Sequence, residues 1–369
     1  MAQSKDYGLG PDTYPRGWFV IAESSEVGVG ETKAVTFFGK DFALYRGQSG
    51  KVVLLDAYCK HMGTHLTQNS SAYIVSSGKQ IEEDSIRCPY HGWRYNAEGH
   101  VDDIPYHDGP CPKSASITSY HVIETFGCIL MWHTSDEERL HSPDFAAPSL
   151  PAWNDKRAIH WQLDHLGELD IHGIEILDNM ADVRHLGPTH GSPCEYFENE
   201  FRDHVVIQRQ GGFLDLYQSH LHTATWYTGP GILLSKQTFS GVVMFEMIAN
   251  TPVSDGRTRA WHAALSFAQS DTITEDDIAM AKEAQAGVLE AFSADFEIWS
   301  NKKSATHIMQ MKKDGPFKDV RAWAQQFYTT KPEEIKAIQA SHNGKKHVLD
   351  FPAPTADNAP DGFEDDCFK

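Results

Sequence analysis

Two short motifs, each pairing a cysteine with a histidine, constrain the fold of this chain more than any other feature. Cys59 and His61 form the first pair, Cys88 and His91 form the second, and 26 residues separate His61 from Cys88. Thiolate and imidazole groups together bind zinc or an iron–sulfur cluster. The chain must therefore bring two loops that are distant in sequence onto one metal centre.

The order of the ligands helps to separate the two kinds of centre. In zinc fingers the like ligands are local neighbours, Cys with Cys and His with His. Here each pair is mixed, which favours a Rieske 2Fe–2S centre in which one iron takes both thiolates and the other takes both imidazoles. Gly63 and Gly92 follow the two pairs and would let the backbone approach a cluster closely. A structural zinc site remains the alternative.

A second concentration of ligand-type residues lies between Asp182 and His190. On a helix, Asp182 and His185 would share a face. His185 and His190 are five residues apart, which would point them more than 100° away from each other. Pro188 is expected to break the helix between them, because proline lacks an amide donor and disfavours helical geometry at Gly187. The two imidazoles could then converge on one metal.

A third ligand for that metal is expected from the helical run LEAFSADFEIWSNK. Two histidines and one carboxylate form the ligand set of non-haem Fe(II) oxygenases. Phe292, Asp295, Phe296 and Trp299 share one stripe of this helix, whereas Glu297 lies on another. An unpaired carboxylate on an apolar stripe is costly, and a metal would satisfy it. We therefore expect Asp295 to be the ligand, with a buried Asp295 paired to Lys or Arg as the alternative.

Composition limits the kinds of partner and compartment. The 369 residues suffice for two domains with separate cores. A formal net charge of −19 argues against nucleic acid as a partner, because such binding depends on Lys and Arg. No apolar run has the length of a membrane span, and the first ten residues lack the apolar segment of a signal peptide. We expect a cytoplasmic protein whose remaining cysteines are reduced: Cys111, Cys128, Cys194 and Cys367.

The chain divides into segments of different character. Short runs rich in Val, Phe and Tyr, separated by turn residues, predict an antiparallel β-domain over residues 15–135 that carries both Cys–His pairs. Residues 136–159 contain Pro and charges without periodicity and predict a linker. Residues 160–345 are expected to form a second antiparallel sheet with helices, among them a helix over about 274–303. Residues 346–369 form an acidic, Pro-rich tail.

The motifs resemble those of a known family, the ring-hydroxylating Rieske non-haem iron oxygenases. The chain is similar to the oxygenase components of bacterial 3-ketosteroid 9-alpha-hydroxylases over about residues 15–330. The segments that carry this similarity are NMADVRH with His190, DFEIW, PRGWF, SPCEYFENEFRDH and RAWAQQFY. GPTHG also resembles the more distant sterol 7-desaturases. The interval between the Cys–His pairs is longer than usual in the family, and we expect its extra residues, SSAYIVSSGKQ, to lengthen a hairpin.

The resemblance implies an α+β fold, with an N-terminal all-β Rieske domain and a C-terminal helix-grip, START-like catalytic domain. It implies cluster ligands at Cys59, His61, Cys88 and His91, and ligands of a mononuclear Fe(II) at His185, His190 and Asp295. It further implies that Asp182 links the iron to the Rieske centre of a neighbouring subunit, and that Asn179 lies beside the iron. His172 lies thirteen residues before His185 and is a candidate for a residue that contacts the metal ligands without binding the metal itself.

The implied activity is that of a terminal monooxygenase, which activates O2 and hydroxylates a steroid-like or other polycyclic apolar substrate. Electrons would come from NAD(P)H through a ferredoxin or a flavin/iron–sulfur reductase, and the family forms head-to-tail homotrimers. One alternative is a sterol or steroid desaturase with the same metals. Another is a Rieske electron carrier whose second domain only binds a ligand.

Overall fold

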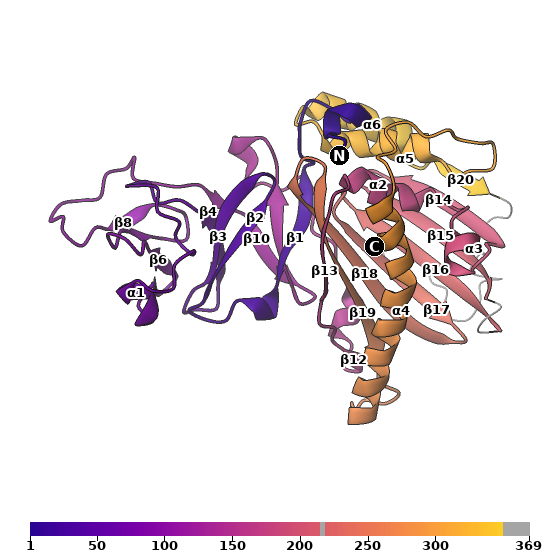
Figure 1. The fold of residues 1–369 in the computed structure, drawn as a ribbon, viewed down its shortest axis with the longest axis horizontal. Coiled ribbons are helices and arrows are strands. Elements are labelled where there is room, and N and C mark those ends of the chain that lie inside the picture. Colours follow the sequence, from indigo (N-terminus) through magenta and orange to yellow (C-terminus); the bar gives the residue numbers. More distant parts are fainter. Residues whose placement is uncertain (215–217, 350–369) are drawn as a thin grey trace. The chain divides into compact units, whose positions relative to one another are not determined.

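The computed structural model of the protein describes residues 1–214 and 218–349 (Figure 1). The chain forms two compact units. The smaller unit consists of Val20–Trp132 and Asp136–Asp144, and the larger consists of Met1–Phe19, His133–Ser135 and the described residues from Phe145 onward. Most of the predicted tail, from position 350, lies outside the described residues, but residues 346–349 form a strand. The predicted domain boundaries stay predictions.

The smaller unit is built almost entirely of short strands in three sheets. The first sheet has the order β1 (Gly17–Glu23), β11 (Cys128–His133) and β10 (Val122–Thr125). The second has the order β2 (Thr32–Phe37), β3 (Lys40–Arg46), β4 (Val52–Asp56) and β9 (Ser119–Tyr120). The third has the order β5 (Ile81–Glu82), β6 (Ser85–Arg87), β7 (Arg94–Tyr95) and β8 (Val101–Asp103). The predicted all-β N-terminal region is confirmed.

One local prediction in this unit is wrong. The residues SSAYIVSSGKQ do not lengthen a hairpin, because they form one helical turn, α1 (Tyr73–Ser76), ahead of β5. The amides of Val75 and Ser76 donate back to the carbonyl of Ala72, and Gly78 ends the turn with a φ of 69°. Side chains in this short turn are exposed or half-buried, so the helix depends on local hydrogen bonds and not on a packed face.

The larger unit is organised around one antiparallel sheet, with nine strands within the described residues. Along the sheet the order is β12, β19, β18, β17, β16, β15, β14, β20, and β13 also pairs with β19. Their bounds in chain order are Ala158–Ile159, Asp164–Leu169, Tyr196–Arg202, Val205–Leu214, Ser219–Thr228, Ile232–Phe239, Val242–Ser254, Arg257–Phe267 and Lys346–Leu349. The predicted sheet-plus-helix catalytic region is thereby confirmed.

Helix α4 (Glu275–Asn301) lies across one face of this sheet (Figure 1). Its start matches the prediction, since Thr274 and Asp277 exchange hydrogen bonds as a capping box. Phe292 and Trp299 on its buried stripe pack against Leu169 of β13 and Ile248 of β18. The stripe therefore fixes which side of α4 faces the sheet.

Four shorter helices complete the larger unit: α2 (Gly173–Leu177), α3 (Leu186–His190), α5 (Phe317–Ala324) and α6 (Pro332–His342). Helices α2 and α5 share a buried cluster that includes Leu177, Phe201, Tyr227 and Trp323. No helix among residues 1–214 and 218–349 is both long and apolar enough to cross a membrane. The five cysteines of these residues are free thiols, and Cys367 lies outside them.

Candidate metal centres

The two Cys–His pairs sit on loops of the same design. Gly63 donates its amide to the carbonyl of Cys59 at 2.9 Å, and Gly92 donates to the carbonyl of Cys88 at 3.0 Å. Both glycines have positive φ, 72° and 76°, a conformation that other residues rarely adopt. The glycines predicted to lie close to a cluster are therefore also the residues that close each loop.

The ligand-type atoms of both loops gather inside the smaller unit. Cys59 and Cys88 are buried in one core cluster, and the His61 and His91 rings lie 4.7 Å apart. The His61 ring is stacked on Trp93 with the ring centroids 4.6 Å apart, and this aromatic side chain covers one face of the imidazole. The Nδ1 atom of His61 is buried and has no hydrogen-bonding partner among the residues that the structure describes. Burying an imidazole nitrogen without a hydrogen-bonding partner costs free energy, and a bond from this nitrogen to iron would remove that cost. The two Cys–His pairs therefore fit a 2Fe–2S cluster.

Tyr95 is a residue of this site that the sequence analysis missed. Its hydroxyl oxygen lies 3.1 Å from Cys59 Sγ and accepts the Lys60 amide at 2.9 Å, which leaves the hydroxyl proton for the sulfur. Hydrogen bonds from the Cys88 thiol and from Tyr95 lower the pKa of Cys59 to about 6. Tyr95 lies two residues after Trp93, on the strand that follows the second Cys–His loop. This position in the sequence could have identified it.

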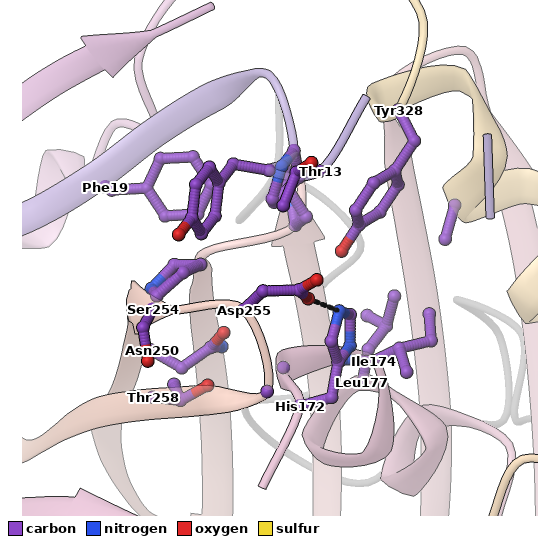
Figure 2. A pocket seen from close by; sticks show the side chains of 17 residues that line it. Thr13, Phe19, His172, Ile174, Leu177, Asn250, Ser254, Asp255, Thr258 and Tyr328 are labelled. Atoms are coloured by element: carbon purple, nitrogen blue, oxygen red, sulfur yellow. Dashed lines mark hydrogen bonds and ion pairs between the residues drawn. The ribbon is translucent and has the colours of Figure 1, made fainter. Parts of the chain in front are cut away.

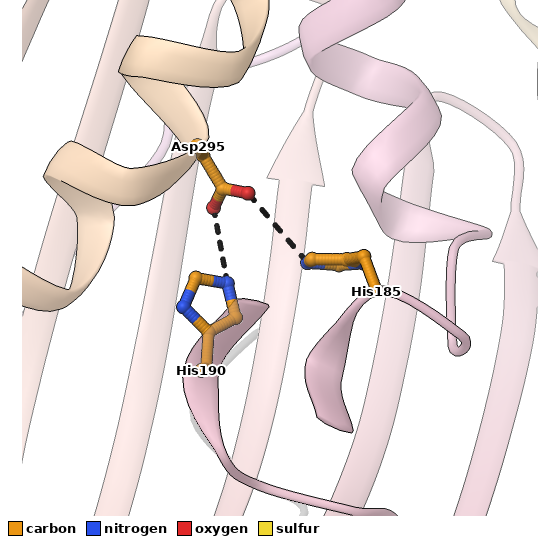
Figure 3. A group of neighbouring side chains, drawn as sticks. All are labelled: His185, His190 and Asp295. Carbon is orange, nitrogen blue, oxygen red and sulfur yellow. Dashed lines mark ion pairs between the residues drawn. The ribbon is translucent and has the colours of Figure 1, made fainter. Parts of the chain in front are cut away.

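The second centre brings together three residues from two distant segments (Figure 3). His185 is the N-cap of helix α3, His190 is the last residue of the same helix, and Asp295 lies on α4. His190 Nε2 is 3.3 Å from Asp295 Oδ2, and His185 Nε2 is 3.9 Å from Asp295 Oδ1. One ligand atom from each residue lies within 4.8 Å of the other two, a spacing that one metal ion could bridge.

Pro188 does not break the helix as predicted. It lies within α3, whose amides in the first turn need no helical partner, so the missing N–H costs nothing. The irregular stretch comes earlier, at residues 181–184, and Gly191 ends the helix with a φ of 61°. The two imidazoles converge from opposite ends of this single helical turn, with ring centroids 5.2 Å apart.

Asp182 orients His185. The Asp182 carbonyl lies 2.6 Å from His185 Nδ1, which must donate to it, so the lone pair of the neutral ring is at Nε2. This nitrogen is the one that faces Asp295. Burial opposes ionisation of the Asp182 carboxyl, but hydrogen bonds from His185 and Arg184 outweigh it and lower the pKa of Asp182. The side chain of Asp182 is one-third exposed.

The surroundings of Asp295 decide between the alternatives that the sequence left open. Asp295 is buried, whereas Glu297 is exposed. The ion-pair partners of Asp295 in the described part of the chain are His185 and His190, and no Lys or Arg there pairs with it. The alternative of a buried Lys or Arg partner is therefore wrong.

Sheet residues that the sequence analysis did not single out hold the loop before His185. Asn199 of β14 donates its side-chain amide to the Met180 carbonyl at 2.6 Å, and Gln208 of β15 donates to the carbonyls of Asn179 and Met180. Gly315 packs against Ala181 so closely that a Cβ would lie 1.4 Å from its carbonyl oxygen. No local pattern marks these contacts, because all of them cross between distant segments.

His172 is a structural residue and not a neighbour of the metal ligands. It caps α2 by accepting the Ile174 amide at Nδ1, and its Nε2 lies 2.9 Å from the Ser4 hydroxyl. Burial lowers the pKa of His172 to about 4, which keeps the ring neutral. The adjoining cavity of about 20 Å³, with Asp255 and Tyr328 in its wall, has room for a single water molecule (Figure 2).

Fold and donor sets together define a Rieske-type non-haem iron oxygenase, and comparison with known proteins agrees. The model of the 3-ketosteroid 9alpha-hydroxylase C-terminal domain matches residues 131–328, and the Rieske 2Fe–2S domain model matches residues 17–124. The chain belongs to the 3-ketosteroid 9alpha-hydroxylase family and carries a Rieske domain ahead of the domain that defines it. The predicted cofactors, a Rieske cluster and a mononuclear iron that uses O2, are confirmed.

Individual relatives are distant but cover most of the chain. An oxygenase component of 3-ketosteroid-9-alpha-monooxygenase from Rhodococcus rhodochrous is 26% identical, covering 88% of this chain and 86% of the relative. The cholesterol 7-desaturase of Caenorhabditis elegans is 26% identical, covering 92% and 83%. Among solved structures, Pseudomonas putida CBB5 NdmA with caffeine has a TM-score of 0.65 at 16% identity, covering 92% and 96%. That last likeness supports the fold alone.

Proposed function

We propose that this protein is the terminal oxygenase of a multi-component system that hydroxylates a steroid-like or other polycyclic apolar molecule. The single observation that carries the proposal is the meeting of His185, His190 and Asp295 in a chain that also holds two Cys–His pairs. The names of the relatives in Rhodococcus support the substrate class. Electrons would come from NAD(P)H through a ferredoxin or a flavin/iron–sulfur reductase.

The residues divide the work between the two centres. Cys59, His61, Cys88 and His91 would hold the cluster, and His185 Nε2, His190 Nε2 and the Asp295 carboxylate would hold the iron. When bound, the cluster supplies electrons singly and the iron activates O2 for insertion into a C–H bond. Asp182 keeps His185 in the tautomer that leaves Nε2 free, and Asn199 and Gln208 hold the loop in place.

Asp182 has a second proposed role between subunits. Its side chain is one-third exposed while its backbone carbonyl is engaged by His185. A carboxylate so placed can accept a hydrogen bond from a cluster-ligand histidine of a neighbouring subunit in a head-to-tail homotrimer. Asn179 would lie beside the iron, because its backbone carbonyl is fixed by Gln208 next to the same loop. We place the protein in the cytoplasm.

Desaturation is the second candidate reaction. It is favoured by one observation, the 26% identity to a cholesterol 7-desaturase over 92% of this chain. Incubation of the iron-loaded protein with a reductase, a 3-ketosteroid or 3-hydroxysteroid, and isotopically labelled O2 separates the two reactions. Hydroxylation adds one labelled oxygen atom to the product, whereas desaturation removes two hydrogens and adds no oxygen.

The same incubation tests the proposal as a whole. No oxidised product from any steroid, in protein with about three irons per chain, would overturn the substrate class. About two irons per chain after full loading would instead favour an electron carrier, since the cluster alone accounts for two.

A further inference from the structure

A pocket of about 740 Å³ lies between the first half of α4 and strands β12, β13 and β19. Its walls are largely apolar and include Trp161, Leu163, Ile278, Ala281 and Leu289. Pockets that hold small molecules have volumes of about 300 to 1,000 Å³ and mostly apolar walls with a few polar groups. By size and lining, this pocket fits a rigid apolar molecule.

Asp164 and Gln285 are two polar groups in the lining of this pocket. The side-chain amide of Gln285 already makes its hydrogen bonds within the protein. Its Nε2 donates to the Gln162 carbonyl at 2.8 Å and to Asp164 Oδ2 at 2.9 Å, and its Oε1 accepts the Ala264 amide. Asp164 Oδ2 is also hydrogen-bonded to His262 Nδ1, at 2.9 Å. Asp164 Oδ1 has no hydrogen-bonding partner within residues 1–214 and 218–349, and the side chain is 27% exposed. This oxygen is available to a ligand.

The charge state of Asp164 follows from its buried neighbour His262. His262 is fully buried, with Nδ1 2.9 Å from Asp164 and Nε2 3.1 Å from Glu246 Oε1. A neutral imidazole has one N–H and can donate to only one of the two carboxylates, whereas the imidazolium donates to both. Hydrogen bonds and charge from Glu246 and Asp164 raise the pKa of His262 against the effect of burial, which favours the imidazolium. Asp164 Oδ2 also accepts from Gln285 Nε2, as an ionised carboxylate does. An ionised Asp164 accepts hydrogen bonds and donates none. It therefore favours a hydroxyl group over a carbonyl group.

We propose that this pocket binds an apolar alcohol of steroid size, whose hydroxyl group donates to Asp164 Oδ1 and whose rings pack against the apolar walls. Lys282 also lines the pocket, and its ammonium repels a cationic ligand, which would compete with an alcohol for Asp164. Asp295 is ten residues beyond Gln285, about 15 Å along the helix, so the site is separate from the iron ligands. The choice of ligand class rests on the proposed function, but the binding itself does not require turnover.

The test measures binding to the iron-loaded full chain by equilibrium dialysis. The probes are three steroids that differ only at carbon 3, which carries a hydroxyl, a ketone or hydrogen alone. The wild-type protein is expected to bind the alcohol about tenfold more tightly than the ketone, since one hydrogen bond to a charged group separates them. In Asp164→Asn the preference for the alcohol is expected to disappear, because an amide can donate to a ketone.

Two alanines of α4 provide a matched pair of variants. Ala281→Phe fills the pocket and is expected to remove one bound equivalent of alcohol per chain, whereas Ala279→Phe alters an exposed residue outside the lining and is expected to keep it. Equal binding of the three probes, no binding of any of them, or an unchanged equivalent in Ala281→Phe would each overturn the proposal. Iron content and product formation, measured on the same samples, report separately on the proposed function.

Discussion

Asp295 Oδ2 lies 3.3 Å from His190 Nε2, although 104 residues separate the two in the chain. His185 Nε2 approaches the other oxygen of the same carboxylate at 3.9 Å. A buried carboxylate shared between two imidazoles, with no Lys or Arg partner in the described part of the chain, is costly without a cation.

Asp295→Ala is expected to lower the iron content from about three to about two per chain after full loading, because the mononuclear site loses its only carboxylate ligand. Elemental analysis together with the protein concentration measures this directly. Glu297→Ala, two residues along the same helix but exposed, is the control and is expected to keep about three irons. Full iron content in Asp295→Ala would contradict the ligand assignment.

Asp182→Ala is expected to keep the iron content of both centres yet to lower turnover by about 10- to 100-fold, the usual cost of losing a residue that orients a metal ligand. The reason is that the carboxylate accepts the amides of Arg184 and His185 and is one-third exposed, while the backbone carbonyl that bonds to the His185 ring remains in the variant. Product formation with a saturating reductase is the measurement. Asp170→Ala, on an exposed acid of the same unit, is the control, and equal turnover in both variants would refute the role of Asp182.

Tyr95→Phe is expected to lower the reduction potential of the cluster by about 50 to 100 mV, because one hydrogen bond to a cluster sulfur is worth about 1 to 2 kcal/mol in favour of the reduced form. A potentiometric titration followed by electron paramagnetic resonance gives the value. Tyr45→Phe removes a hydroxyl in the same core that bonds to the Asp84 carbonyl, and it should leave the potential unchanged. A similar shift in both variants would mean that the Tyr95 hydroxyl has no specific effect on the cluster.

The stability of the larger unit is expected to fall as pH rises above neutrality. Burial opposes the charged form of His262, but hydrogen bonds and charge from Glu246 and Asp164 outweigh it and raise its pKa. The other groups around this trio are neutral. Gln237 donates a hydrogen bond to Glu246, Gln285 donates one to Asp164, and the centroid of the Phe292 ring lies 6.0 Å from that of His262. Because the folded-state pKa is raised, this stabilisation is complete below about pH 6.5 and is lost as pH rises through the folded-state value.

Urea unfolding of the wild type and of His262→Gln at pH 6 and pH 9 measures this contribution. At pH 6 the variant is expected to be about 3 kcal/mol less stable, the usual cost of breaking a buried ion pair. At pH 9 the difference is expected to be smaller, because the wild type loses the imidazolium as pH rises through the raised pKa of His262. His160→Gln changes an exposed histidine stacked on Trp153 and should show no such narrowing. A constant difference at both pH values would show that His262 does not titrate in this range.

Sequence was sufficient where a feature depends on neighbours a few residues apart. The mixed Cys–His pairs favoured a Rieske cluster over zinc, and the capping box at Thr274 located the start of α4. The apolar stripe through Phe292 and Trp299 showed that Asp295 faces inward and Glu297 outward, as the structure has them. In each case the residues that determine the feature lie within one loop or within about two turns of one helix.

Tertiary structure decided everything that joins distant segments. Pro188 was expected to end a helix, but the sheet and Gly315 hold the preceding loop, so the irregular stretch falls at residues 181–184 and α3 continues through the proline. Tyr95 contacts Cys59 across the core, and Asp295 contacts His190 across 104 intervening residues. No local spacing in the sequence encodes these contacts. Helices and turns form through contacts between residues that are close in sequence, so the sequence predicts them. Which metal-ligand residues meet depends on how α4 packs on the sheet, and only the tertiary structure shows this.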